Sequence, residues 1–347
     1  MSLIRVSALC ALGLPFFAPS LSTDYTQRRS LRIEVETSLE METTSFEMMI
    51  DGEPMERAGM GGQASEEARV FTIIDEVLAD DEGRPTEVRR EFETVERETL
   101  RVMGEEELVD EASGPLDGVT VLLTSEDDGE VEAEVENGSV DDDELLAGQH
   151  LELACDAFLP EGELEVDDSW DLESDAILRA LGLDLEAVWF PVSQDGDADG
   201  GWRRGRGSRG RSSFGLLVEA DWEGTATLAS LEEEYEGLSC VLIELELEAS
   251  GDQEEMERWG GRRGRGGAAG FVGSVSAPLE STYEIELEGR LLFSLEQGRP
   301  LLLEIEGDVS TERTMERNSE RGDFSMSSTQ EGSFTYSAAI SLEESEG

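Results

Sequence analysis

Apolar and polar residues alternate along most of this sequence, most regularly between positions 283 and 309. On both sides of a short polar segment at 297–300, every second residue is apolar and glutamates fill many of the places between them. The apolar positions are Tyr283, Ile285, Leu287, Leu301, Leu303 and Ile305. Because successive side chains of a strand point to opposite faces, the pattern predicts a β-hairpin with one apolar and one acidic face. Such a hairpin belongs in the middle of a sheet.

The same alternation recurs through much of the chain. It is present in segments 31–50, 70–78, 87–102, 116–124, 130–136, 222–230, 238–249 and 332–342. Turn signals separate several of these segments, among them Asp51-Gly52 and Asp128-Gly129. Strands joined in this way predict a mainly antiparallel sheet.

The middle of the chain has a different pattern. Residues 141–158 begin with a run of acidic residues, which suits a helix N-terminus, and continue with apolar residues near helical spacing. Residues 174–185 carry a similar apolar face. We therefore expect an α+β protein that is mainly β: a curved antiparallel sheet or half-barrel, with these two helices on its concave face. Residues 23–347 are expected to form a single domain.

Charge changes the picture of the outer surface. The 347 residues include 83 acidic and 26 basic ones, which gives a formal net charge of −57, and every basic residue is an arginine. Carboxylates on neighbouring strands repel, and salt weakens this repulsion by shortening the screening length. The acidity indicates either a saline habitat or a solvated surface that keeps the protein soluble. In both cases the body should repel nucleic acid and anionic membranes.

The first 22 residues resemble an export signal. Arg5 precedes a short apolar run at 6–14, and small residues at 18–22 suit cleavage after Ser20 or Ser22. The apolar run is too short to span a membrane, and the sequence shows no later transmembrane segment. Leu9 stands where a lipidated Cys10 would need a small residue, so we expect no lipid anchor. The protein is therefore expected in the periplasm or outside the cell.

Two cysteines remain after removal of this signal. An exported chain permits Cys155 and Cys240 to form a disulfide. Both also have apolar neighbours in the sequence, which equally favours two buried free thiols. The sequence leaves these alternatives open.

One sequence element consists of Leu159-Pro160 followed by residues 166–170, Val-Asp-Asp-Ser-Trp. This element, with the later segment 289–298, resembles a group of uncharacterised exported bacterial β-rich proteins. The sequence departs from the group at Asp167, where the group has Gly, and at Ser294, where it often has Asp. The resemblance implies an arrangement similar to the half-barrels of bacterial lipoprotein carriers, and it implies no activity. We interpret residues 167–170 as a structural corner in which Trp170 fills part of the core.

Two Arg-Gly segments, at 194–213 and 251–273, are expected to be flexible loops. Each combines acidic residues, a tryptophan and an arginine-glycine tract. Their candidate partner-binding residues are Trp202, Arg203, Arg204, Arg206, Trp259, Arg262, Arg263 and Arg265. Arginine and aromatic residues together can bind single-stranded nucleic acid, but the acidity of the body argues against that use. The remaining alternatives are simple surface loops, contacts with the acidic body, or binding of an anionic partner such as a polysaccharide or a second copy.

Signals for catalysis and cofactors are weak. Asp195, Asp197 and Asp199 match the opening of a calcium-binding loop, but Arg206 occupies the place of its bidentate glutamate, so calcium binding is the less favoured alternative to an acidic loop. His150 is the single histidine, and no G-x-S-x-G or H-E-x-x-H motif accompanies it. We expect His150 to be structural, and we expect the protein not to be an enzyme and to carry no cofactor.

Two functional hypotheses remain. In the first, the curved sheet and the helices at 141–158 and 174–185 enclose an apolar cavity for a lipid-like ligand. In the second, the interior is filled, and the protein is a structural or interaction protein of the cell envelope that acts through its acidic surface and Arg-Gly segments.

Overall fold

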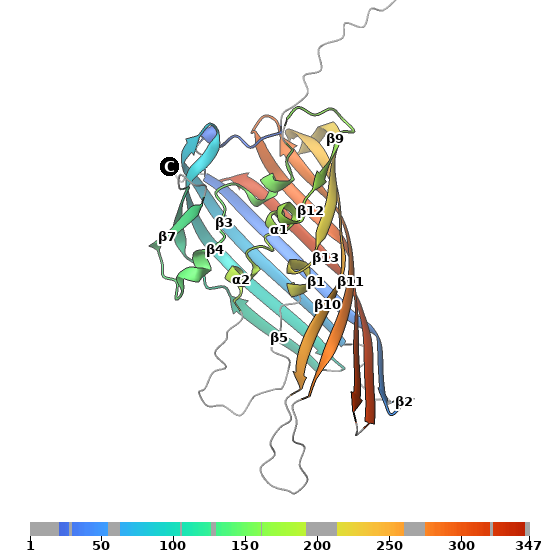
Figure 1. The fold of residues 1–347 in the computed structure, drawn as a ribbon. Helices are drawn as coiled ribbons and strands as arrows, with labels where there is room; N and C mark the ends of the chain where they lie inside the picture. Colours follow the sequence, from blue (N-terminus) through green and yellow to red (C-terminus); the bar gives the residue numbers. More distant parts are fainter. Residues whose placement is uncertain are drawn as a thin grey trace, which may run out of the picture.

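The computed structural model describes most of the chain. The described residues are 21–27, 30–54, 63–104, 106–125, 130–160, 162–191, 214–259, 275–319 and 322–343. Within these ranges one antiparallel sheet of 13 strands accounts for most of the structure (Figure 1). The expected mainly β fold is confirmed.

The strands are long and run in a continuous order across the sheet. Their bounds are β1 Ser30–Ile50, β2 Glu53–Pro54, β3 Gln63–Asp81, β4 Arg84–Met103, β5 Glu106–Ser113, β6 Thr120–Ser125, β7 Val131–Asn137, β8 Ser169–Leu172, β9 Trp222–Tyr235, β10 Leu238–Trp259, β11 Val275–Ser294, β12 Arg299–Ser319 and β13 Gly322–Leu342. The order is β7-β6-β4-β3-β1-β13-β12-β11-β10-β9-β8, with β2 paired to β1 and β5 paired to β4. The first and last long strands are therefore neighbours in the middle of the sheet.

The hairpin that the alternation predicted is formed by β11 and β12. Ile285 pairs with Val309 and Leu291 pairs with Leu303. Ile285 and Leu303 are buried, while the intervening glutamates of both strands are largely exposed. The alternation along these strands thus sorts the side chains into an inner apolar face and an outer acidic face, as the sequence predicted.

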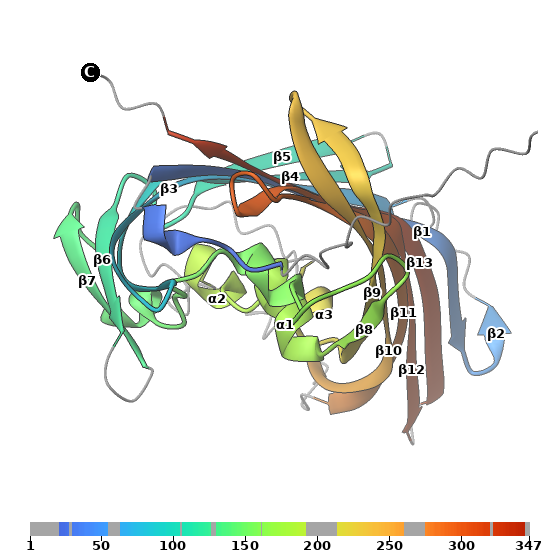
Figure 2. The ribbon, with the colours of Figure 1, turned by 90° about the horizontal axis from the view of Figure 1, so that it is seen from above.

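Short helices from the middle of the chain lie in the hollow of the curved sheet (Figure 2). They are η2 Asp143–Leu146, η3 Ala154–Phe158, α1 Ser174–Ala180, α2 Glu186–Trp189 and α3 Gly215–Val218, and an N-terminal turn, η1 Tyr25–Gln27, lies beside them. We call residues 141–158, 174–190 and 214–218 the helical cover. Its buried side chains belong to the same core cluster as the inner face of the sheet.

Both predicted helices are shorter than the sequence analysis suggested. The single helix expected at 141–158 is wrong, because two 3-10 turns are present and Gly148 between them has a φ of +74°. The helix expected at 174–185 ends at Ala180. There the backbone N–H of Gly182 donates to the carbonyl of Arg179 and that of Leu183 donates to Leu178. Gly182, with a φ of +65°, thus completes a Schellman motif that stops the helix.

The corner at 167–170 contacts the core as interpreted. Asp167 has a φ of +74°, a backbone angle that favours glycine. Trp170 packs partly buried against the core, and its indole N–H donates to the carbonyl of Phe158 at 3.1 Å. Cys155 and Cys240 are both buried and free, so the structure contains the two thiols rather than a disulfide between them.

The second Arg-Gly segment was expected to be a loop from residue 251, but its first nine residues belong to a strand. Residues 251–259 continue β10, and β11 begins at Val275, with Trp259 paired to Val275. Only residues 260–274 between these strands are outside the described part of the chain, as is the whole of the first segment, 194–213.

Candidate functional site: an apolar cavity under the helical cover

A cavity of about 100 Å³ lies between the inner face of the sheet and the helical cover. Its floor is built from three adjacent strands, β3, β1 and β13. The floor residues are Phe71 and Ile73 from β3, Ile33 and Val35 from β1, and Ala338 and Ile340 from β13. Within each strand these residues are two positions apart, so their side chains point to the same face of the sheet.

The cover supplies the roof of this cavity. The apolar roof residues are Leu153, Ala154, Cys155, Leu181, Leu183, Leu185, Trp189 and Phe214. Trp189 packs on Phe71 with ring centroids 4.8 Å apart, so the roof is in direct contact with the floor at that end. Ligand pockets commonly have about 300–1,000 Å³. At about 100 Å³ this cavity is therefore too small for a long lipid chain.

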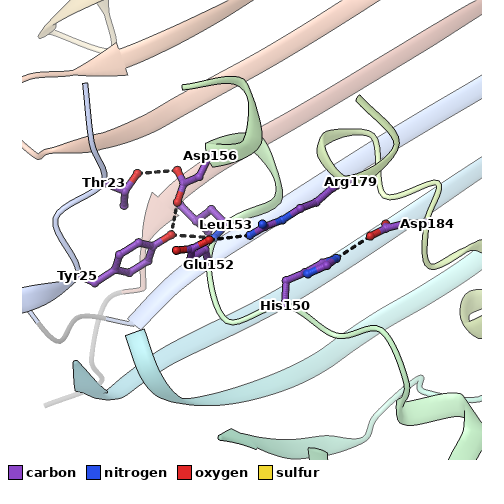
Figure 3. A network of polar contacts seen from close by, with 8 residues as sticks. All are labelled: Thr23, Tyr25, His150, Glu152, Leu153, Asp156, Arg179 and Asp184. Carbon is purple, nitrogen blue, oxygen red and sulfur yellow. Dashed lines mark hydrogen bonds and ion pairs between the residues drawn. The ribbon is translucent and has the colours of Figure 1, made fainter. Parts of the chain in front are cut away.

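Polar residues on the cover form one edge of the cavity (Figure 3). The Nε2 of His150 lies 2.6 Å from the carboxylate of Asp184, and Arg179 donates to Glu152 at 3.0 Å. All four side chains are partly exposed. His150 and Asp184 thus connect two turns of the cover.

A polar row crosses the inner face at one end of the cavity. Tyr336 of β13 pairs with Thr37 of β1, Thr37 pairs with Arg69 of β3, and Arg69 pairs with Arg97 of β4. Tyr336 donates its hydroxyl to the carbonyl of Ala180 at 3.1 Å and thereby holds the end of α1. Burial raises the pKa of Tyr336 well above its ordinary value, so this donor stays protonated.

Arg69 connects the sheet to the cover through ion pairs. Its guanidinium donates to Glu67 on the same strand at 2.7 Å and binds both carboxylate oxygens of Glu186 on α2. Phe214 stacks on the guanidinium, with 3.7 Å between Arg69 Cζ and the ring centroid. Arg69 and Glu67 are both almost fully buried. Such a pair is costly to break on one side, because a buried charge would lose its partner.

A second buried ion pair lies at the other end of the cavity. Arg90 of β4 binds Asp75 of β3 through two hydrogen bonds of 2.7 Å, and it donates to Gln149 of the cover at 3.1 Å. The cover is therefore attached to the sheet by arginines at both ends of the cavity.

The N-terminal segment also contacts the helical cover, at η3 and the residue before it. Thr23 and Tyr25 both donate hydroxyl hydrogen bonds to Asp156 of η3, and Tyr25 accepts one from the backbone N–H of Leu153 (Figure 3). Burial raises the pKa of Asp156 to about 6, although the two hydroxyl donors act in the opposite direction. Burial also raises the pKa of the neighbouring Cys155 thiol, which keeps it protonated and unreactive.

Most candidate residues named from the sequence lie outside the described part of the chain. This is true of Trp202, Arg203, Arg204, Arg206, Arg262, Arg263 and Arg265, and of the calcium candidates Asp195, Asp197 and Asp199. Trp259 is the last residue of β10. Within the described ranges, no cluster of three or more His, Cys, Asp or Glu side chains is suited to a metal ion.

The arginines of the inner face were not predicted from the sequence. A signal was present, because Arg69 and Glu67 stand in the same alternation phase as Phe71, and Arg90 stands in phase with Phe92. A charged residue at an inward position needs a buried partner, so it indicates a polar site inside the sheet.

Comparisons with known proteins place no family on this chain. No family model and no curated protein matches it. Among solved structures, the chain is similar to one described as "Lipid-protein interactions in lipovitellin", with 8% identity and a TM-score of 0.29. The match covers 92% of this chain and 25% of that one, so this chain spans about a quarter of the length of the lipovitellin chain. A TM-score of this size carries no functional argument. Across the described ranges, no helix has the length and apolar character needed to cross a membrane.

Proposed function

We propose that this protein is an exported, non-catalytic binding module that takes up the apolar chain of a lipid-like ligand between the sheet and the helical cover. The observation that carries the proposal is the apolar cavity whose floor belongs to the sheet and whose roof belongs to a separate set of short helices. A site divided in this way can enlarge when the roof moves and the floor stays in place.

The construction of the cover supports such movement. Its longest helix, α1, has 7 residues, and its other helices have 4 or 5. Helices of this length have little stability of their own, so the cover depends on its contacts with the sheet. Those contacts include a few polar attachments, at Arg69, Arg90 and Tyr336. In the proposed binding reaction, the ligand chain replaces the apolar contacts of the roof with the floor.

Two adjacent residues of β13 provide a matched test. Ala338 lines the cavity, whereas Ala339 lies on the opposite face of the strand and packs in a separate cluster. We expect Ala338→Phe to fill the cavity and to abolish binding of the apolar fluorescent probe N-phenyl-1-naphthylamine, while Ala339→Phe leaves it unchanged. Purified wild-type protein should also release acyl lipid on solvent extraction, detected by mass spectrometry. The absence of both probe binding and co-purified lipid in the wild type would show the proposal to be wrong.

A second candidate function rests on the outer face. There, Glu246, Glu288 and Glu306 are directly opposed across three strands, and Glu248, Glu286 and Asp308 form a neighbouring row. This surface supports the alternative of an envelope interaction protein that binds a cationic partner. Ala338→Phe distinguishes the two candidates. Binding of a cationic partner to the outer face should persist in this variant, whereas binding of an apolar chain should be lost.

A further inference from the structure

We infer that the polar row at the end of the cavity is an anion site, and that the ligand is an amphiphile whose carboxylate head group binds among Thr37, Arg69 and Arg97. This inference rests on the proposed function and specifies the chemical class of its ligand. It starts from two buried polar atoms that have no hydrogen-bond partner among the described residues.

The first atom is the hydroxyl oxygen of Thr37. The residue is 7% exposed, lines the cavity and stands between the apolar floor residue Val35 and the buried Leu39. Its Oγ1 has no hydrogen-bond partner among the described residues. A buried hydroxyl without a hydrogen-bond partner is less favourable than a satisfied one, so a ligand atom that binds it removes a penalty.

The second atom is the Nε of Arg97, which is buried and also has no hydrogen-bond partner within the described part of the chain. No carboxylate among the described residues forms an ion pair with this guanidinium, although the chain carries 83 acidic residues. Its partner is aromatic: Arg97 Cζ lies 4.9 Å from the centroid of the Phe190 ring. Arg97 is therefore a positive charge on the inner face that no described negative charge balances directly.

The register brings these groups together. Thr37, Arg69 and Arg97 are directly opposed on three neighbouring strands, so their side chains leave the same face. Neighbouring strands are about 4.8 Å apart, which places Thr37 and Arg97 on either side of Arg69 within reach of one small head group. A guanidinium presents parallel N–H donors that fit a carboxylate, and a threonine hydroxyl adds one more donor.

The charge balance explains why the site would fill when the cover moves. Glu67 and Glu186 both bind Arg69, so two carboxylates accompany the two guanidinium groups of Arg69 and Arg97 in this region. Glu186 belongs to α2, so displacement of the cover withdraws one carboxylate and leaves one excess positive charge on the inner face. An incoming carboxylate restores neutrality by taking the place of the Glu186 carboxylate. The head group would lie at Thr37 and Arg69, and the chain would extend over the apolar floor from Val35 and Phe71 toward Ile33 and Ile73.

The test compares hexadecanoate with its methyl ester, which has the same chain and no charge. Each compound displaces N-phenyl-1-naphthylamine from the full-length protein. We expect wild-type protein to bind the acid at least about tenfold more tightly than the ester, since hydrogen bonds to a charged group are the stronger class. Arg97→Gln and Thr37→Val should each remove most of this preference and leave the affinity for the ester unchanged.

Two controls separate binding from folding and from net charge. Thr37→Val replaces an unpartnered hydroxyl with a methyl group of similar size, so its unfolding midpoint should equal or exceed that of the wild type. Arg290→Gln removes one positive charge from the exposed outer face and should keep the preference for the acid. Equal binding of acid and ester by the wild type would overturn the anion site but not the proposed function. A preference that persists in both Thr37→Val and Arg97→Gln would also overturn it, and failure of both compounds to bind would overturn both proposals.

Discussion

Arg90 and Asp75 face each other across β3 and β4 in a doubly hydrogen-bonded ion pair that is buried in the inner face of the sheet. Their sequence neighbours Arg89 and Glu76 form a similar pair on the exposed outer face of the same two strands. The hairpin of β3 and β4 thus carries one arginine–carboxylate pair buried on its inner face and another exposed to solvent on its outer face.

This arrangement predicts unequal effects of matched substitutions. Asp75→Asn leaves the Arg90 charge buried without its partner and should lower the free energy of unfolding by about 3–5 kcal/mol. Glu76→Gln removes a carboxylate that water and salt already screen, so its effect should be much smaller. Urea unfolding of both variants measures the difference, and equal losses would contradict the assignment of the Arg90 pair to the interior.

A pH dependence follows from Asp156. Its pKa is raised to about 6 in the folded protein, mainly by burial, and lies near its ordinary value in the unfolded chain. Between about pH 4 and 6 the folded state therefore retains a proton that the unfolded chain has released. The stabilising contribution is complete below about pH 4 and is lost as pH rises through about 6, for a total of about 3 kcal/mol.

Asp156→Asn isolates this contribution from the many other carboxylates. The stability of the wild type relative to this variant should fall between pH 4 and 6 and then stay constant. Unfolding by urea at pH 4, 5, 6 and 7 checks the prediction. A difference between the two proteins that does not change with pH would show that Asp156 titrates normally.

Salt should stabilise this protein, because carboxylates oppose one another on the outer face. Glu286 lies between Glu248 and Asp308, so Glu286→Gln should raise the free energy of unfolding by about 0.5 kcal/mol at low salt. The gain should vanish in 1 M NaCl, where the screening length is about 3 Å. Glu304→Gln is the control, because Glu304 pairs with Arg290 and its loss should not stabilise. Thermal unfolding in 10 mM and 1 M NaCl distinguishes the two variants.

If the protein is exported as proposed, the packing of the N-terminal segment favours one of the two expected cleavage sites. Leu21 is 1% exposed and belongs to the main core cluster. Cleavage after Ser22 would remove this side chain, whereas cleavage after Ser20 would keep it. If the protein is exported as proposed, N-terminal sequencing of the mature form should find Leu21 first. A mature chain that begins at Thr23 would contradict this prediction.

The sequence predicted the faces of the strands better than their partners. Alternation places Ile285 and Leu303 inside regardless of which strands are adjacent, and the hairpin turns then fix the local pairs. The pairing of β1 with β13 has no local signal, because either strand would bury its apolar face equally well beside another neighbour. Strand β5 was missed for a similar reason, since its side chains are largely exposed and show no alternation in burial.

The candidate site was predictable only in outline. An apolar space under helical elements followed from the amphipathic middle segments, but its small volume depends on how Trp189 packs on Phe71. The helix boundaries depended on Gly148 and Gly182, whose positive φ angles interrupt an otherwise helical pattern. The arginines at inward positions were visible in the sequence and are the signal that could have located the polar row.

The pairing of β1 with β13 also determines when, during synthesis of the chain, the whole sheet can form. Leu31 pairs with Leu342 and Ile50 pairs with Phe324, so the centre of the sheet cannot close until the C-terminal strand has been synthesised. Contacts between residues so distant in sequence favour slow folding, and during this time the edge of β1 is available to other chains. The two halves of the sheet would therefore join only after the strand at 322–342 has been synthesised.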